Sequence, residues 1–373
     1  MKSCALSLLS AGIACAFISQ PASAVEVYKD DKQSAEIKGF FRIKAQHSDD
    51  DDEIKDGTSR IGFHFGRELT HDWRAMAVLE WGLDIVEGES GLKVTQGDGL
   101  TSNDDRGENI WNRLGYIGVI HDDYGEITMG KRWGVYYEVT YPTDELESFG
   151  GEASGTYNFG TDGGLSGTGR AEKALQYRNS WGPFWLGLQY QAKDDSIALD
   201  PDDFPDLEAT IDKAYSIAAT YTTPIGIILG AAYNRADISL SNAGSTADDD
   251  IAIAASAKYG TISEPGLYAG LVYAVSENHE SDSNGIVYDA KGYEALVQWG
   301  FENNVQVYGA VNHLEEDDDD YQGEAELDYY VVGSRYRWTP DFHLAFEIKF
   351  EDSTDGDGNS ADDIYAFSVK YAF

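Results

Sequence analysis

The feature that most restricts the fold of this chain is an alternation of apolar and polar residues with a period of two. It is clearest from Tyr365 to Phe373, where large apolar residues occupy the odd positions and small or polar residues the even ones. The segment from Phe342 to Phe350 repeats the pattern, with charged residues on its second face. Successive side chains of a strand point to opposite faces, so both segments are predicted strands with one apolar face.

One such strand could equally belong to a soluble sandwich, but their number and their connections favour another fold. Short turns such as Thr222-Thr223-Pro224 alternate with long polar segments such as Trp133 to Gly169, 193–212 and 235–249. This asymmetry is typical of transmembrane β-barrels. Further predicted strands are 73–85, 184–191, 215–221, 225–233, 251–259, 267–275 and 293–301.

The predicted fold class is therefore all-β, a transmembrane antiparallel β-barrel of about 16 strands at roughly 22 residues per strand and connection. After residue 24 no apolar run reaches 18 residues, which argues against helical membrane spans. Aromatic residues expected near the strand ends, where they would form interfacial girdles, are Trp73, Trp181, Trp299, Trp338, Phe342 and Phe373.

Residues 1–24 are predicted to be a signal peptide that is removed before Val25. Lys2 supplies a positive start, an apolar run follows, and Ala22-Ser23-Ala24 offers the small residues of a cleavage site. An alternative is a lipoprotein acylated at Cys15, but the leucine expected three residues upstream is absent. Both cysteines of the chain lie in this leader, so the remaining domain, residues 25–373, has no thiol.

The charge of this domain argues against a nucleic-acid partner. It contains 26 basic residues, because Lys2 of the 27 lies in the leader, against 66 acidic ones, a net charge of −40. Such a chain repels polyanions. Acidic runs such as Asp49 to Glu53 and Glu315 to Asp320 lie in the predicted long loops. Loosely bound divalent cations at these outer loops remain an open alternative.

Motifs of enzymes and metal sites are absent or broken. The segment Gly125 to Lys131 matches phosphate-loop spacing, but Arg132 stands where a serine or threonine is needed. The seven histidines form no zinc-type pair, and the acidic segment 352–363 lacks the spacing of an EF-hand loop. We expect no enzymatic activity, no cofactor and no defined metal site. A Ser/His/Asp set assembled from distant strands stays open on sequence alone.

Several local matches, in order and spacing, give the chain a resemblance to a known family. They include Ser59-Arg60-Ile61-Gly62-Phe63, the segment Arg113 to Gly118, the segment Tyr124 to Lys131, the loop motif Phe149-Gly150-Gly151, and Tyr177-Arg178-Asn179. With the predicted leader, strand rhythm and terminal phenylalanine, the chain resembles the general, non-specific porins of Gram-negative bacteria over its whole mature length.

The resemblance implies a homotrimer of 16-stranded barrels in the outer membrane, reached by export through the periplasm. Each barrel would have its long third loop folded into its own lumen. The implied function is passive diffusion of ions and small hydrophilic solutes through a water-filled channel, with outer-membrane lipid and lipopolysaccharide around the barrel.

The resemblance also implies a constriction at which basic wall residues face acidic loop residues. The matching wall positions are Arg60, Arg113 and Arg170, and the matching loop acids are Asp144, Glu147 and Glu152, with Glu145 as a further candidate. Strand parity adds an independent argument, because Arg42, Arg60 and Arg74 alternate against apolar neighbours and so face away from lipid. Where the family often has a lysine, this chain has Phe40.

Two other functions remain as alternatives, a substrate-specific channel and a surface-interaction or structural barrel. A sugar-specific channel would show a ladder of lumen aromatics, whereas most aromatics here have lipid-facing parity, with Phe40, Tyr268 and Tyr308 as exceptions. A structural barrel would tend to be small and plugged, or to have a separate soluble domain. The sequence therefore favours a general channel.

Overall fold

The computed structural model describes residues 24–49, 51–70, 72–86, 110–158, 166–198, 208–242, 245–282, 286–317, 321 and 323–373. The predicted signal peptide lies outside the described residues, apart from Ala24. The described helical turns are α1 (Tyr137–Thr140) and η1 (Tyr141–Thr143), and within these ranges no helix is long and apolar enough to cross a membrane.

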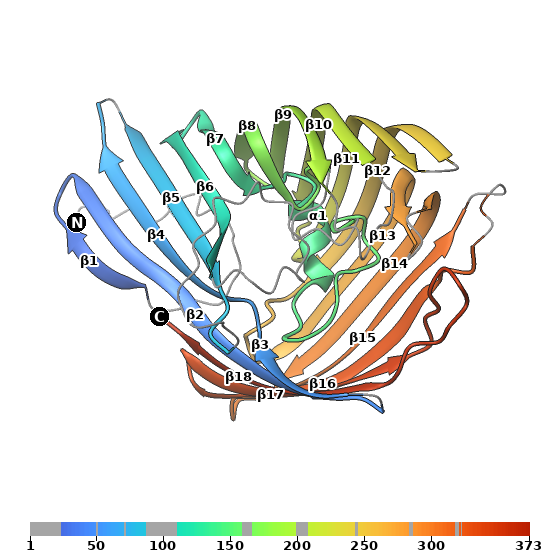
Figure 1. The fold of residues 1–373 in the computed structure, drawn as a ribbon. Helices are drawn as coiled ribbons and strands as arrows, with labels where there is room; N and C mark the ends of the chain where they lie inside the picture. The colour runs from blue at the N-terminus through green and yellow to red at the C-terminus, as the bar shows by residue number, and fades with distance from the viewer. Residues whose placement is uncertain are drawn as a thin grey trace.

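The strands form one closed antiparallel barrel around α1 (Figure 1). Sixteen strands make the ring, with each strand paired to the next and β18 paired to β2. The predicted barrel is thereby confirmed. The strands are β1 (Val25–Lys29), β2 (Gln33–His47), β3 (Asp52–Asp56), β4 (Ser59–Glu68), β5 (Trp73–Leu83), β6 (Ile110–His121), β7 (Gly125–Trp133), β8 (Arg170–Trp181), β9 (Phe184–Ala198), β10 (Glu208–Thr222), β11 (Ile227–Asn242), β12 (Ser245–Tyr259), β13 (Gly266–Ser281), β14 (Val287–Gly300), β15 (Val305–Glu316), β16 (Leu327–Thr339), β17 (Phe342–Glu351) and β18 (Ile364–Ala372).

The two remaining strands, β1 and β3, lie along β2. Val25 of β1 is opposite Ile37, and Phe373 exchanges backbone hydrogen bonds of 2.8 and 2.9 Å with Gly39, two residues farther along β2. The beginning of β1 and the end of β18 therefore meet on the same side of β2. Closure in this way leaves no long unpaired edge among the described strands.

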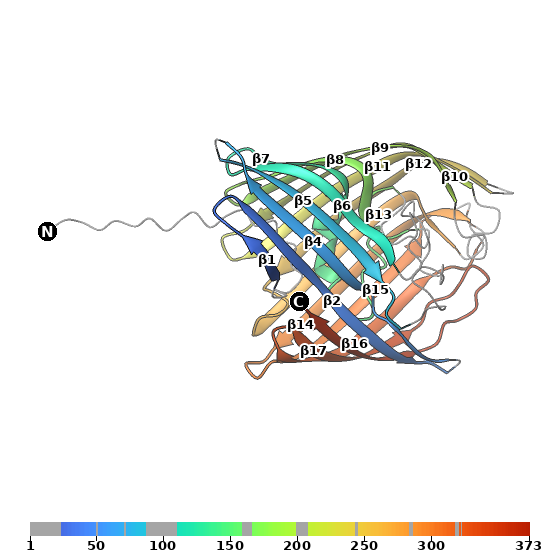
Figure 2. The same ribbon diagram turned by 60° about the vertical axis from the view of Figure 1, so that its left-hand side comes forward.

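The alternation in the sequence separates an apolar outside from a polar inside. On β15 Val307 is exposed on the outer surface, whereas Gln306 and Tyr308 are buried inside the barrel. Outward aromatics gather at two levels: Tyr293 and Tyr330 lie toward the long loops, and Trp299 and Trp338 lie toward the short turns. These are the positions of the two interfacial girdles of a membrane barrel. Seen from the side, the strands cross the barrel wall obliquely (Figure 2).

Strand ends differ from the sequence-based expectation on the long-loop side. The predicted long loop 235–249 is mostly strand, because β11 continues to Asn242 and β12 begins at Ser245. In the predicted loop 193–212, β9 continues to Ala198 and β10 begins at Glu208. The hydrophobic alternation reports contact with lipid, and it ends where the strands leave the membrane, although backbone pairing continues beyond that level.

The direction of the barrel in the membrane can be tested with single cysteines, because residues 25–373 contain none. Asn303→Cys lies in the short turn between β14 and β15, and Asp357→Cys lies in the long connection between β17 and β18. We expect a membrane-impermeant maleimide to label Asp357→Cys on intact cells and Asn303→Cys only after lysis. Equal labelling of both on intact cells would contradict this orientation.

Candidate functional site: the loop inside the barrel

The connection between β7 and β8, residues 134–169, is called loop 3, and its described residues 134–158 and 166–169 lie inside the barrel. Its first turns, α1 and η1, contact the inner faces of β10 to β14. Val135, Tyr136 and Val139 are fully buried there. They pack against a set of inward alanines: Ala218, Ala232, Ala252, Ala254 and Ala274. Short side chains on four adjacent strands thus leave the space that loop 3 occupies.

Two glycines let the loop backbone touch the wall itself. A Cβ atom at Gly270 of β13 would lie 2.2 Å from the carbonyl oxygen of Pro142, and one at Gly292 of β14 would lie 1.8 Å from that of Ala153. The Tyr268 hydroxyl also donates a hydrogen bond of 2.7 Å to Pro142 O. Only glycine allows so close an approach, and the position of loop 3 therefore depends on both residues.

Carboxylates of the wall hold the backbone of loop 3. Glu294 accepts hydrogen bonds from the Thr143 hydroxyl and from the Ala153 N–H, the latter at 2.7 Å. Glu347 of β17 accepts hydrogen bonds from the backbone N–H groups of Glu147 and Ser148, at 2.9 and 2.8 Å. Bonds to an ionised acceptor are roughly twice as strong as neutral ones. Loop 3 is thus fixed to β14 at one point and to β17 at another.

A histidine of the wall holds loop 3 near Gly155 and Asn158. His279 of β13 is completely buried, and its Nε2 lies 2.9 Å from Gly155 O while its Nδ1 lies 2.7 Å from Asp250 of β12. The Asn158 side chain of loop 3 donates to the carbonyl oxygen of His279 at 3.1 Å. The loop therefore has polar attachments along its length as well as an apolar base.

Glu147, one of the predicted loop acids, is bound directly by the basic wall. Its two oxygens lie 2.9 Å from Arg42 Nη1 and 2.8 Å from Arg335 Nη2, with Lys370 Nζ at 3.7 Å and His343 Nε2 at 2.9 Å. The Glu147 side chain is only 5% exposed. The resemblance implied an acid that faces the basic wall across the open pore. The Glu147 carboxylate instead contacts the wall directly, and it joins loop 3 to β2, β16, β17 and β18.

The predicted arginines occupy the strands opposite the base of loop 3. Arg113 Nε lies 3.0 Å from Glu80 Oε1, and Arg60 Nη1 lies 3.8 Å from the same oxygen. Arg113 is the extra residue of a β-bulge, because Glu80 pairs with Leu114 and Trp81 with Asn112. Bulges of this kind redirect a side chain. Here the bulge brings Arg113 beside Glu80 and Arg60.

The other two predicted arginines differ in their surroundings. The Arg170 guanidinium lies 4.8 Å from the ring centre of Trp133, at the start of β8. Arg74 forms an ion pair of 2.8 Å with Asp122 beside a short turn. On β5, Arg74 is eight residues from Gly82, the partner of Arg60, which is about 26 Å along a strand. Arg74 therefore does not lie at the level of loop 3.

The remaining loop acids have a less ionic environment than Glu147. Asp144 accepts hydrogen bonds of 2.9 Å from the hydroxyls of Tyr137 and Tyr157. Burial raises the pKa of Asp144 to about 6, although both tyrosine hydrogen bonds lower it. Burial and the adjacent Asp144 raise the pKa of Glu145 to about 8. Glu152 is exposed. The charges of Asp144 and Glu145 therefore change near neutral pH.

Several residues of the site were not singled out from the sequence: Glu80, Arg335, His343, Glu347 and Lys370. Parity placed His343, Glu347 and Lys370 on the polar faces of their strands, but parity does not say how high on the wall a residue lies. Phe40 was noted as an unusual lumen aromatic, and it lies 4.5 Å from the Arg60 guanidinium and 4.4 Å from Lys370 Nζ. A cation above the face of an aromatic ring is attracted by the quadrupole of that ring.

A closed barrel with an apolar exterior, an ionised interior and a loop fixed inside it defines a membrane channel narrowed by its own chain. The family model described as Gram-negative porin matches residues 9–356, and the chain belongs to this family. The protein is therefore an outer-membrane porin, which is a passive channel and not an enzyme.

Individual relatives are similar over nearly the whole chain. Outer membrane protein S2 of Salmonella typhi is 26% identical, over 94% of this chain and 95% of its own length. The putative outer membrane porin protein NmpC of Escherichia coli K12 is 26% identical, over 98% of both chains. Among solved structures, Salmonella typhi OmpF in complex with daunomycin has a TM-score of 0.72 at 20% identity, covering 94% of this chain and 100% of that one.

A second solved structure adds an assembly to the comparison. The trimer form of the outer membrane protein OmpT of Vibrio cholerae has a TM-score of 0.64 at 16% identity, and the match covers 92% of this chain and 100% of that one. At this identity the similarity shows the fold, which agrees with the sixteen-stranded barrel described above.

Proposed function

We propose that the protein is a general diffusion channel for ions and small hydrophilic solutes, with ion preference set by charges at the level of loop 3. One observation supports this most directly: Arg60 and Arg113 lie on one wall, while Asp144 and Glu145 lie on the loop that faces it. Opposed charges across a narrow aqueous passage produce a transverse field that biases ion passage. Glu147 acts mainly as the attachment of the loop.

The aromatic residues of the lumen support a general channel over a sugar-specific one. Tyr268 and Tyr308 are 1% and 5% exposed, and their hydroxyls bind Pro142 O and Glu347. A stacking ladder for a sugar needs free ring faces. Loop 3 and its contacts occupy the surroundings of these rings. The apolar outer band of the barrel supports contact with outer-membrane lipid and lipopolysaccharide. Cleavage of an export signal after Ala24 would make Val25, the first residue of β1, the new N-terminus.

The ion preference provides the test. At pH 9, where both carboxyls are ionised, Asp144→Asn with Glu145→Gln removes charge at nearly constant size and is expected to shift reversal potentials under a KCl gradient toward anions. Arg60→Gln with Arg113→Gln should shift them toward cations. Unit charges about 4 Å apart interact by about 1 to 4 kcal/mol between water and protein-surface dielectrics, enough for a several-fold change in permeability ratio. Identical potentials for wild type and both double variants would refute this assignment.

Lowering the pH tests the same charges without mutation. Because the pKa values of Asp144 and Glu145 are raised to about 6 and about 8, both carboxyls lose their negative charge between pH 9 and pH 5. The wild-type channel should become less cation-preferring over this range. The Asp144→Asn, Glu145→Gln variant should show a smaller change, and an undiminished change would assign the pH effect to other groups.

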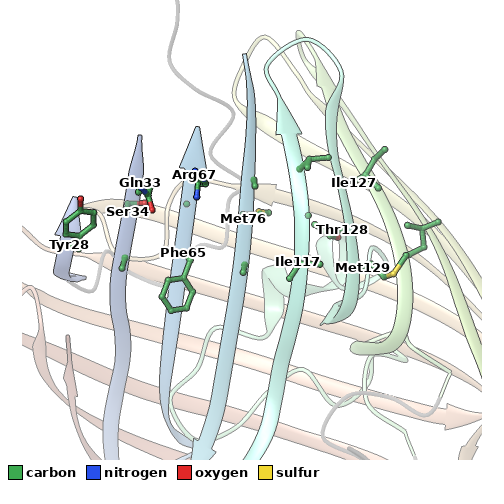
Figure 3. A pocket seen from close by; sticks show the side chains of 17 residues that line it. Tyr28, Gln33, Ser34, Phe65, Arg67, Met76, Ile117, Ile127, Thr128 and Met129 are labelled. Carbon is green, nitrogen blue, oxygen red and sulfur yellow. The ribbon is translucent and has the colours of Figure 1, made fainter. Parts of the chain in front are cut away.

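We further propose a homotrimer that uses the outer face of β2 and β4 to β8. A groove of about 720 Å³ lies on this face (Figure 3). Exposed Phe65, Ile117 and Met129 surround it, and the small side chains of Ala75 and Ala77 form part of its lining. A concave apolar surface of this size fits the side chains of a second copy. The trimer form of the Vibrio cholerae protein supports the same assembly.

Filling the groove should weaken this assembly. We expect Ala77→Trp to lower the trimer fraction on unheated SDS gels and by light scattering, because a large ring excludes the neighbouring copy. Ala255→Trp is the matched control, since Ala255 is exposed on β12 outside this face. A trimer fraction that falls equally in both variants, or in neither, would contradict the proposed interface.

A further inference from the structure

A cluster of possible metal ligands lies outside the pore, on the outer surface at the level of Tyr293, which is the cross-strand partner of His313. His313 of β15 pairs directly opposite Asp328 of β16, and Glu326 precedes β16. One ligand atom each of His313, Glu326 and Asp328 lies within 4.8 Å of the other two. The porin function described above uses none of these residues.

The distance between the first two residues is informative. His313 Nδ1 and Asp328 Oδ2 are 3.4 Å apart, whereas a charge-assisted hydrogen bond is about 2.7 to 2.9 Å long. Two ligands bound to one tetrahedral zinc ion at about 2.0 to 2.2 Å lie about 3.3 to 3.5 Å apart. The exposed pair His47 and Asp52 shows the ordinary alternative, with its Nδ1 and Oδ1 at 2.7 Å.

Two polar atoms of the cluster also lack hydrogen-bond partners within the described residues. His313 Nδ1 and Asp328 Oδ1 are buried from solvent and have no hydrogen-bond partner within the described part of the chain. A buried polar atom without a partner costs about 1 to 3 kcal/mol. A cation bound by the imidazole would satisfy Nδ1, and it would also satisfy Oδ1 if the Asp328 carboxylate bound it through both oxygens.

The neighbours of His313 restrict the positions that its ring can take. Glu315 Oε2 lies 3.6 Å from Nε2, the nitrogen that does not face the cluster, which is too long for a direct hydrogen bond. The Tyr293 ring lies 4.7 Å from the imidazole, centre to centre, and limits its rotation.

We propose that His313, Glu326 and Asp328 bind a zinc ion on the outer surface of the barrel, with water as the fourth ligand. The imidazole favours zinc over calcium and magnesium, which prefer sites made only of oxygen. The sequence analysis expected no defined metal site because the ligands come from β15, from β16 and from the residue before β16, and they follow no motif spacing. The pairing of β15 with β16 brings His313 and Asp328 together.

Isothermal titration with zinc sulfate tests the proposal on the folded, chelator-treated protein in detergent. We expect one zinc ion per chain and at least tenfold weaker binding in His313→Gln and Asp328→Asn. His47→Gln is the matched control and should bind as the wild type does. The heat-dependent gel shift of each variant reports that it is folded.

Three results would overturn the proposal. Equal zinc affinity of wild type and His313→Gln would show that the imidazole is not a ligand. An equal loss of zinc affinity in His47→Gln would show that the binding is non-specific. Displacement of zinc by calcium at similar concentrations would assign the cluster to general carboxylate binding of cations. Zinc binding that survives a large excess of calcium and is lost only in the cluster variants would support the site.

Discussion

Replacing Glu147 by Gln is expected to increase single-channel conductance and open-channel noise, and to move the ion preference toward anions. The exchange keeps the size of the side chain and removes the counter-charge of Arg42, Arg335 and Lys370. Removing one member of a buried ion pair costs about 3 to 5 kcal/mol. The tip of loop 3 should loosen, although Glu347 still binds its backbone.

Glu152→Gln is the matched control for this prediction, because it removes the same charge from an exposed position of the same loop. Planar-bilayer recording of both variants at one salt concentration makes the comparison. Only Glu147→Gln should raise the open-channel noise. If the two variants show the same noise and conductance as the wild type, Glu147 does not hold the loop.

The substitution Gly292→Ala should have the opposite effect on conductance. Its Cβ atom would lie 1.8 Å from Ala153 O, and ordinary contact requires a displacement of about 1.5 Å or more. The wall strand is paired on both sides, so the loop is the part that moves. It moves into the lumen, weakens the bond between Ala153 N and Glu294, and lowers the conductance.

Gly309→Ala is a matched control on the neighbouring strand, because a Cβ at Gly309 meets only Val331 O at 3.6 Å. Single-channel recording should show a lower conductance for Gly292→Ala and a wild-type value for Gly309→Ala. A heat-dependent gel shift for both variants would show that they fold. Wild-type conductance in folded Gly292→Ala would mean that loop 3 does not rest against β14 there.

The sequence predicted the barrel because the physical rule behind it is local. A strand between lipid and water must alternate, and residues 365–373 and 342–350 show this without any knowledge of their neighbours. The same rule could not find the ends of β11 and β12, because beyond the membrane no lipid contact imposes apolar residues. It also could not show that β3 pairs with β2 inside a predicted loop.

The charged site was only partly predictable from the sequence, because it depends on how far along the barrel axis each inward residue lies. Parity gave Arg42, Arg60 and Arg74 the same inward direction. It could not show that Arg74 lies near a short turn, away from the level of loop 3. The level of a residue depends on register and bulges, such as the bulge at Arg113. The contact of Glu147 with Arg335 and Lys370 joins residues about 190 and 220 positions apart, which no local pattern encodes.

The central claim is that this porin is a passive, water-filled channel whose width is limited by loop 3. Swelling of liposomes in isotonic sugars measures this most directly. We predict that the wild type admits pentoses faster than hexoses and hexoses faster than disaccharides, and that Glu147→Gln narrows these differences while Gly292→Ala widens them. Folded, heat-modifiable protein that produces no swelling with any sugar, or the same size dependence in all three proteins, would contradict the claim.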